Sequence, residues 1–206
     1  YEDGLTLNSG DAATDFTGAT LSNLDHLDVT ASALTIADLT LGDGGANGSV
    51  ALDVNTGGNL TLRGDVSTAG EGAASGAVAL DGVGGSIVLD EDGADNDSTV
   101  TITTDATTTD QPVSLGRVTR STAALALTVA AGDSDITFGG SVGTDAAPIG
   151  DLSAVGATVN LDGDIDAASI SVLASTAVDV DSPDAGVVID ARSASSTIDL
   201  AGGDIV

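Results

Sequence analysis

The sequence predicts an all-β fold in which the chain winds repeatedly through short strands that each bury one face. Three observations support this prediction: a recurring apolar-x-apolar triplet, a near-regular spacing of the triplets, and an unusual composition. Aromatic residues make up 1% of the 206 residues, and 28 Gly accompany only 3 Pro. Large rings are not available to fill a thick core, so small aliphatic side chains must fill it, and turns must depend on Gly, Asn and Asp.

The triplets have the two-residue period of a strand with one buried face. Their middle residues are small or polar, as an outward-facing position requires, whereas helical patterning is scarce. The first and third residues are therefore expected to point inward. The set expected inside comprises Leu60, Leu62, Val78, Leu80, Val159, Leu161, Ile198 and Leu200.

The spacing of the triplets indicates a repeat. Successive triplets start at residues 39, 60, 78, 100, 136, 159, 178 and 198, with one more start expected near Val118, which gives about 20 residues per turn. A fixed period of this length is typical of a solenoid, whose coils bury their apolar faces only by stacking. Since parallel crossovers are nearly always right-handed, the fold class expected is a right-handed parallel β-helix.

Residues 1–206 are expected to form one solenoid segment of a longer repetitive chain, with less regular coils over residues 1–38. No linker rich in Pro or Ser and no shift in composition marks a domain boundary. Several triplets continue through a Gly corner into another apolar residue, as in LTLRGDV (60–66), ITFGGSV (136–142) and VNLDGDI (159–165).

The stretch LTVAAGDSDITFGGSVGTDAAPIGDLSAVGATVNLDGDI (127–165) resembles the β-helical repeat regions of filamentous-haemagglutinin-like large exoproteins and giant bacterial adhesins. The resemblance covers most of residues 39–206. It implies a right-handed parallel β-helix that is exported and displayed as a long fibre.

The charge balance excludes several classes of function. Thirty-two acidic residues, 29 of them Asp, stand against four Arg and no Lys, for a net charge of −28. This charge repels nucleic acid and anionic membranes, and the four Arg form no cluster for phosphate binding. The absence of Cys excludes disulfides, Cys-ligated zinc and thiol catalysis. Neither a nucleic-acid partner nor membrane insertion is expected.

The densest acidic cluster runs from Asp90 to Asp97. Alternating carboxylates around a Gly turn are the ligands that calcium prefers, so Asp90, Asp92, Asp95 and Asp97 are the predicted metal ligands. A solvated acidic loop is the alternative and the favoured interpretation of this cluster. Asp162, Asp164 and Asp166 alternate in the same way, and there a solvated strand face is the better interpretation.

Catalysis is not expected. Paired carboxylates can cleave polysaccharides on a β-helix, but sugar clefts use aromatic platforms and basic residues, and this chain has no Trp and no Lys. His26 is the only histidine, so no His-based triad or metal site can form. The tripeptide Arg63-Gly64-Asp65 spells an integrin-binding motif, but it also fits the repeat, where Gly64 is a corner.

The function predicted is that of a secreted structural or adhesive protein that builds an extracellular fibre or surface layer. The alternative is a passive stalk of an exoprotein whose enzymatic or ligand-binding domain lies outside this segment. The expected partners are other copies of the chain and cell-surface or matrix polymers.

Overall fold

The structure is a computed structural model. It describes residues 4–10, 12–17, 21–22, 26–42, 51–69, 74–90, 98–181, 186–193 and 196–205. These residues form 22 strands and no helix, and every strand pairing among them is parallel. The prediction of an all-β fold with parallel strands is confirmed.

The strands form three rows, named A, B and C here, and the chain enters them in that order again and again. Row A contains β1 (Gly4–Asn8), β4 (His26–Ala31), β7 (Ala51–Thr56), β10 (Val78–Leu80), β13 (Val113–Leu115), β16 (Ile136–Phe138) and β22 (Asp204–Ile205). Row B contains β2 (Ala13–Thr17), β5 (Ala33–Ala37), β8 (Leu60–Leu62), β11 (Ile87–Leu89), β14 (Val118–Arg120), β18 (Ile165–Ala167) and β20 (Ile189–Ala191). Row C contains β3 (Leu21–Ser22), β6 (Leu39–Gly42), β9 (Val66–Ser67), β12 (Thr99–Thr103), β15 (Ala126–Ala130) and β21 (Ile198–Ala201).

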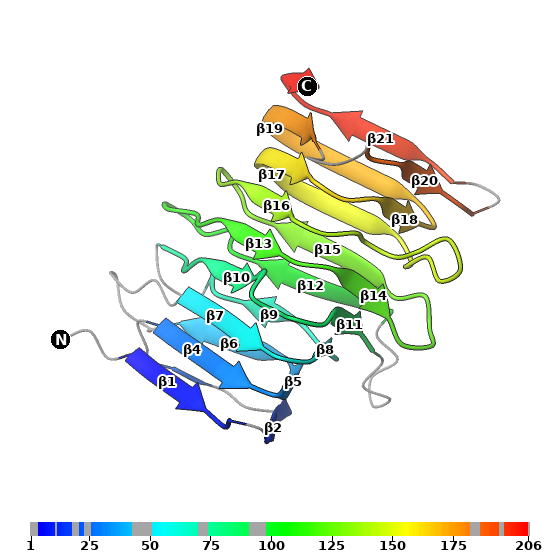
Figure 1. Ribbon diagram of the computed structural model, residues 1–206. Coiled ribbons are helices and arrows are strands. Elements are labelled where there is room, and N and C mark those ends of the chain that lie inside the picture. The colour runs from blue at the N-terminus through cyan, green and yellow to red at the C-terminus, as the bar shows by residue number, and fades with distance from the viewer. Residues whose placement is uncertain are drawn as a thin grey trace.

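Two long strands join rows C and A into one sheet. β17 (Leu152–Leu161) pairs with β15 through its first half and with β16 through its second half, and β19 (Ile170–Val180) lies beside β17 along most of its length. In row B, Val142 bridges Val118 to Ile165. The strands lie side by side from β1 near the N-terminus to β21 and β22 near the C-terminus (Figure 1).

The repeat is longer than the sequence predicted. Row A advances from Leu5 to Ile205 in eight pairings, about 25 residues for each, instead of the predicted 20. Individual pairings join residues from 18 to 36 positions apart. The estimate was wrong because triplets occur in all three rows, so intervals such as that from Leu39 in row C to Leu60 in row B are not one full repeat.

The apolar residues of the three rows meet in one core. Leu60, Leu62, Val78, Leu80, Val159 and Leu161 are all at most 1% exposed, which confirms their predicted inward orientation. Among the residues that the structure describes, Phe138 is the largest fully buried side chain. The prediction was wrong for Ile198, which is 50% exposed, and Leu200 is only partly buried. Both lie on β21, which pairs with β19 on one side and has no further strand beyond it among the described residues.

Short polar side chains link successive strands where the chain turns a corner. We call these Asp and Asn residues corner acceptors. Each directly precedes a buried strand residue. Its Oδ1 atom accepts a hydrogen bond from the backbone N–H of the register-equivalent residue at the next strand. A side chain as short as Asp or Asn spans the distance of about 4.8 Å between neighbouring strands. The pairs are Asp38 with Asp65 (3.1 Å), Asn59 with Ser86 (3.0 Å), Asp65 with Thr101 (2.7 Å), Asp135 with Thr158 (3.1 Å) and Asp164 with Val188 (2.8 Å).

Candidate functional site

Three aspartates that are far apart in sequence converge on the outer side of row B. Asp145, Asp166 and Asp190 each contribute a carboxylate oxygen, and these oxygens lie within 4.8 Å of one another. In the described part of the chain, this is the one group of three or more His, Cys, Asp or Glu side chains that meets this criterion. The cluster could hold a metal ion.

The strand register fixes two of the three aspartates. Asp166 on β18 pairs directly with Asp190 on β20, so their side chains lie on the same face of adjacent strands. The Asp166 backbone is held on both sides, since its N–H donates to the Val142 carbonyl at 2.7 Å and its carbonyl accepts from the Ile149 N–H at 3.1 Å.

A tight turn brings Asp145 to the cluster. Thr144 and Ala147 exchange backbone hydrogen bonds of 3.2 and 2.9 Å, which leaves Asp145 inside the turn. Gly143 precedes the turn with a φ of +73°, and a Cβ atom there would lie 2.1 Å from the Asp166 carbonyl oxygen. Only glycine fits this close approach in the left-handed region. The segment 143–148 thus supplies one member of the cluster.

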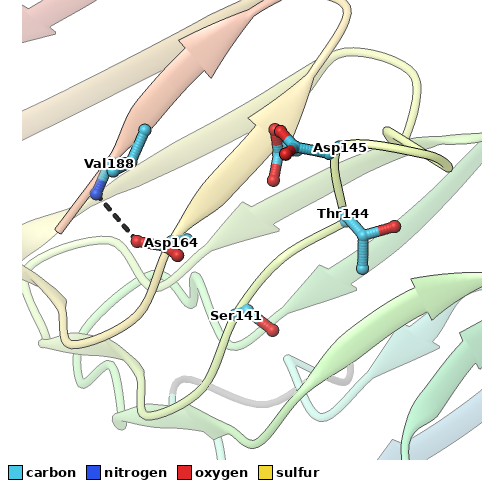
Figure 2. A pocket seen from close by; sticks show the side chains of 7 residues that line it. Ser141, Thr144, Asp145, Asp164 and Val188 are labelled. Atoms are coloured by element: carbon cyan, nitrogen blue, oxygen red, sulfur yellow. Dashed lines mark hydrogen bonds between the residues drawn. The ribbon is translucent and has the colours of Figure 1, made fainter.

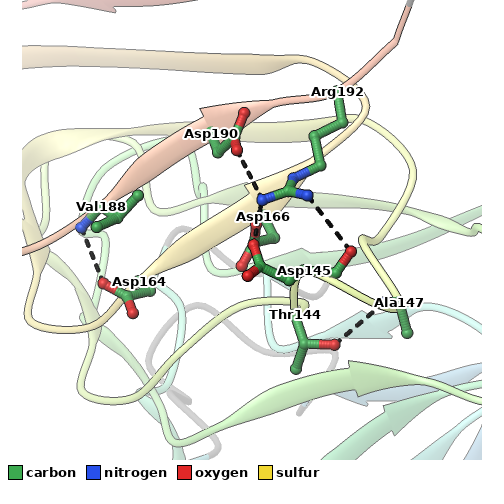
Figure 3. Close-up of polar contacts among 8 residues, drawn as sticks. All are labelled: Thr144, Asp145, Ala147, Asp164, Asp166, Val188, Asp190 and Arg192. Carbon is green, nitrogen blue, oxygen red and sulfur yellow. Dashed lines mark hydrogen bonds and ion pairs between the residues drawn. The ribbon is translucent and has the colours of Figure 1, made fainter.

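Arg192 lies among the three carboxylates (Figure 3). Its Nη2 atom is 3.1 Å from Asp166 Oδ1 and 2.7 Å from Asp190 Oδ2, and it also contacts Asp145 Oδ1. The backbone N–H of Arg192 donates to the Ala167 carbonyl at 2.9 Å, which extends the pairing of β20 with β18. One guanidinium therefore shares its positive charge among three carboxylates from three successive levels of row B.

Asp166 is the buried member of the cluster, with 8% of its surface exposed. Its contact with Arg192 is an ion pair without hydrogen-bond geometry, so the buried Oδ1 atom accepts no hydrogen bond. Burial raises the pKa of the Asp166 carboxyl above its ordinary value of 3.8, Arg192 opposes this rise, and the surrounding carboxylates add to it. The negative charge of Asp166 is therefore poorly compensated.

A cavity of about 350 Å³ adjoins the cluster (Figure 2). Asp145, Asp164 and Asp166 line it with carboxylates, and its other lining residues are Ser141, Gly143, Thr144 and Val188. The corner acceptor Asp164 is already bonded to the Val188 N–H. Carboxylate and hydroxyl oxygens are the donors that hard cations prefer, whereas the cavity offers no nitrogen or sulfur ligand side chain.

The predicted calcium ligands lie elsewhere. Asp92, Asp95 and Asp97 fall outside the described residues. Asp90 follows β11 and contacts the residues that directly follow the two neighbouring strands, β8 and β14: its Oδ2 atom is 3.0 Å from Arg63 Nε, and its Oδ1 atom accepts a hydrogen bond from the Ser121 hydroxyl. The interpretation of Asp162, Asp164 and Asp166 as a solvated face is wrong for Asp166, because Arg192 and the 143–148 segment cover it.

The Arg63-Gly64-Asp65 tripeptide takes part in links between strands. Arg63 pairs with Asp90, and Asp65 accepts from the Thr101 N–H while its own N–H donates to Asp38. A Cβ atom on Gly64 would lie 2.4 Å from the Asp38 carboxylate. These contacts give each of the three residues a structural role.

Sequence reasoning missed Asp145, Asp190 and Arg192 as members of a site. One signal was present, namely the tripeptide Ile-Asp-Ala at both 165–167 and 189–191, which pairs with itself in register. Asp145 had no comparable signal, because its position depends on the path of the turn that begins at Gly143.

None of the described residues belongs to a helix long and apolar enough to cross a membrane. No protein-family model, curated protein sequence or solved structure matches the chain significantly.

Proposed function

We propose that this chain is a segment of a three-sided, right-handed parallel β-helix that serves as a structural or adhesive element of an extracellular fibre or surface layer. The observation that carries the proposal is the repeated passage of the chain through rows A, B and C, always in that order and always with parallel pairing. Such a sequence of parallel strands stacks one pass on the next and can continue for as long as the repeat does.

The distribution of side chains supports a structural role. The core consists almost entirely of Leu, Val, Ile and Ala, and the outward positions carry Thr, Ser, Asp and Asn. An acidic surface with net charge −28 keeps a long rod soluble and opposes sideways clumping. The resemblance of residues 127–165 to the repeats of large exoproteins supports export and display on the cell surface.

Further layers of the same kind are the partners that fit this architecture. Val188, Ile198 and Ile205, on or beside the last strands of the three rows, are 59%, 50% and 61% exposed. The backbone groups along β21 and β22 pair on one side only within the described residues. Continued coils or a second copy of the chain would cover both the apolar side chains and the strand edge.

Calcium is the counter-ion proposed for the acidic surface, since oxygen ligands abound and histidine and cysteine ligands are scarce or absent. A non-enzymatic role is part of the proposal. The stalk of a larger exoprotein remains the second candidate, because the same stacked strands would suit a passive spacer.

The experiment is immunogold electron microscopy on the producing cells with an antibody against residues 98–181. The proposal expects labels at regular positions along extracellular filaments or over a surface layer. Labelling confined to the cell interior would contradict it. Labels restricted to one point near the base of each projection would favour the stalk.

A further inference from the structure

We infer that Asp145, Asp166 and Asp190 form a binding site for a divalent cation of the calcium class, in which the Arg192 guanidinium is a resident counter-charge that the ion replaces. This inference concerns one site on row B and does not depend on the chain forming a fibre.

The first observation is that the buried carboxylate of Asp166 is only partly compensated by Arg192. Asp166 is 8% exposed as a whole residue and 11% exposed at its side chain, its Oδ1 atom accepts no hydrogen bond, and the residue lines the cavity. A buried carboxylate normally has either hydrogen-bond donors or a full counter-charge. The Arg192 Nη2 atom makes three carboxylate contacts, and only one of them is to Asp166. The other two are to Asp145 and Asp190, so the three carboxylates share one positive charge.

The second observation is the spacing of the oxygens. Calcium binds oxygen at about 2.3–2.6 Å, so two ligands on opposite sides of one ion lie about 5 Å apart. The three carboxylate oxygens lie within 4.8 Å of one another, which matches this limit. They already surround a cationic atom, Arg192 Nη2, which shows that one compact positive centre can be shared by all three.

The exchange of Arg192 for an ion is physically reasonable. The Arg192 side chain is 34% exposed and reaches the cluster from the end of β20, so it can turn outward without disturbing the core. Asp164, Ser141 and Thr144 also line the adjoining cavity, where water molecules can complete the coordination shell. A divalent ion neutralises more of the carboxylate charge than one guanidinium does.

A bound ion would link three levels of row B. Asp145 follows the level of Val142, Asp166 lies on β18 and Asp190 lies on β20. Calcium would therefore hold the last levels of the row together and stabilise the C-terminal part of the described chain.

The test is isothermal titration of the chelator-treated protein with calcium chloride at 0.15 M NaCl. Arg192→Gln removes the competing charge and is expected to bind calcium at least about tenfold more tightly than the wild type. Adding Asp166→Asn to Arg192→Gln should abolish the tightened site. The matched control adds Asp81→Asn, which removes an exposed carboxylate far from the cluster, and should keep the site.

Either of two results would overturn the inference. One is that Arg192→Gln binds calcium no more tightly than the wild type. The other is that the double variant with Asp166→Asn and the double variant with Asp81→Asn bind calcium equally well. Binding by the acidic loop 90–97 is common to both double variants and cancels in the comparison. If Arg192→Gln does not fold, the single variant Asp190→Asn tests the site instead, because it removes one proposed calcium ligand and leaves Arg192 in place. The calcium-induced rise in melting temperature should then be smaller in Asp190→Asn than in Asp81→Asn, and equal rises would reject the site.

Discussion

The Oδ1 atom of Asp65 accepts a hydrogen bond of 2.7 Å from the backbone N–H of Thr101, a residue 36 positions further along the chain. The same kind of bond recurs at Asp38, Asn59, Asp135 and Asp164. It gives a physical reason for the excess of Asp over Glu, since the shorter side chain reaches the next strand without leaving the corner.

Replacing Asp65 by Ala removes this acceptor and leaves the Thr101 N–H without its partner. We expect the free energy of unfolding to fall by about 1 kcal/mol. Asp65→Asn keeps the Oδ1 acceptor and is the control, with a much smaller loss. Urea unfolding measures both, and equal losses in the two variants would show that charge, not the hydrogen bond, is what matters at this corner.

Leu62→Ala tests the shared core. Leu62 is fully buried on β8, and its removal is expected to cost about 2–5 kcal/mol of unfolding free energy through lost burial and a cavity. Its neighbour Thr61 points outward, so Thr61→Ala should cost less than about 1 kcal/mol. Thermal unfolding of the two variants distinguishes them, and a larger effect at Thr61 would invert the assigned faces of β8.

Gly143→Ala should destabilise the turn that carries Asp145. The residue has a φ of +73°, and the added Cβ would lie 2.1 Å from the Asp166 carbonyl oxygen, so we expect a loss of more than about 2 kcal/mol. Gly57 has no atom within 4 Å of its ideal Cβ position and no positive φ, which makes Gly57→Ala a suitable control. Near-equal melting temperatures for the two variants would contradict the described path of the turn.

The predicted calcium loop can be tested apart from the cluster on row B. Replacing Asp92, Asp95 and Asp97 together by Asn should reduce the amount of calcium bound in equilibrium dialysis, because three carboxylate ligands are lost. Asp133, Asp181 and Asp199 replaced together by Asn remove the same charge from exposed positions elsewhere. Undiminished binding in the first triple variant would remove the loop from consideration.

The sequence was informative about the strands because burial imposes a two-residue period that survives any variation in loop length. On that basis alone the sequence predicts that Leu60, Leu62, Val159 and Leu161 point inward, and the structure agrees. The length of the repeat was harder to predict. Triplets from three rows look alike, and pairings from 18 to 36 residues apart leave no constant interval to detect.

Most members of the candidate site could not be predicted from the sequence, because they lie far apart along the chain. Asp145, Asp166 and Asp190 are brought together by strand register and by one turn, not by proximity in sequence. The acidic run from Asp90 to Asp97 was conspicuous because its members are adjacent. Register is set by tertiary packing, so a site built across successive strands has only a weak local signature.

Register-equivalent residues in row A stack one level at a time. The pairings run from Thr6 through Asp28, Asp53, Ala79, Ser114, Thr137 and Asn160 to Asp179. Because the chain has no native Cys, spin labels can be attached to cysteines introduced in pairs. At about 4.8 Å per level, double electron–electron resonance should give about 19 Å for positions 6 and 114 and about 34 Å for positions 6 and 179. Distances that fail to grow with the number of levels would contradict the stacked parallel arrangement.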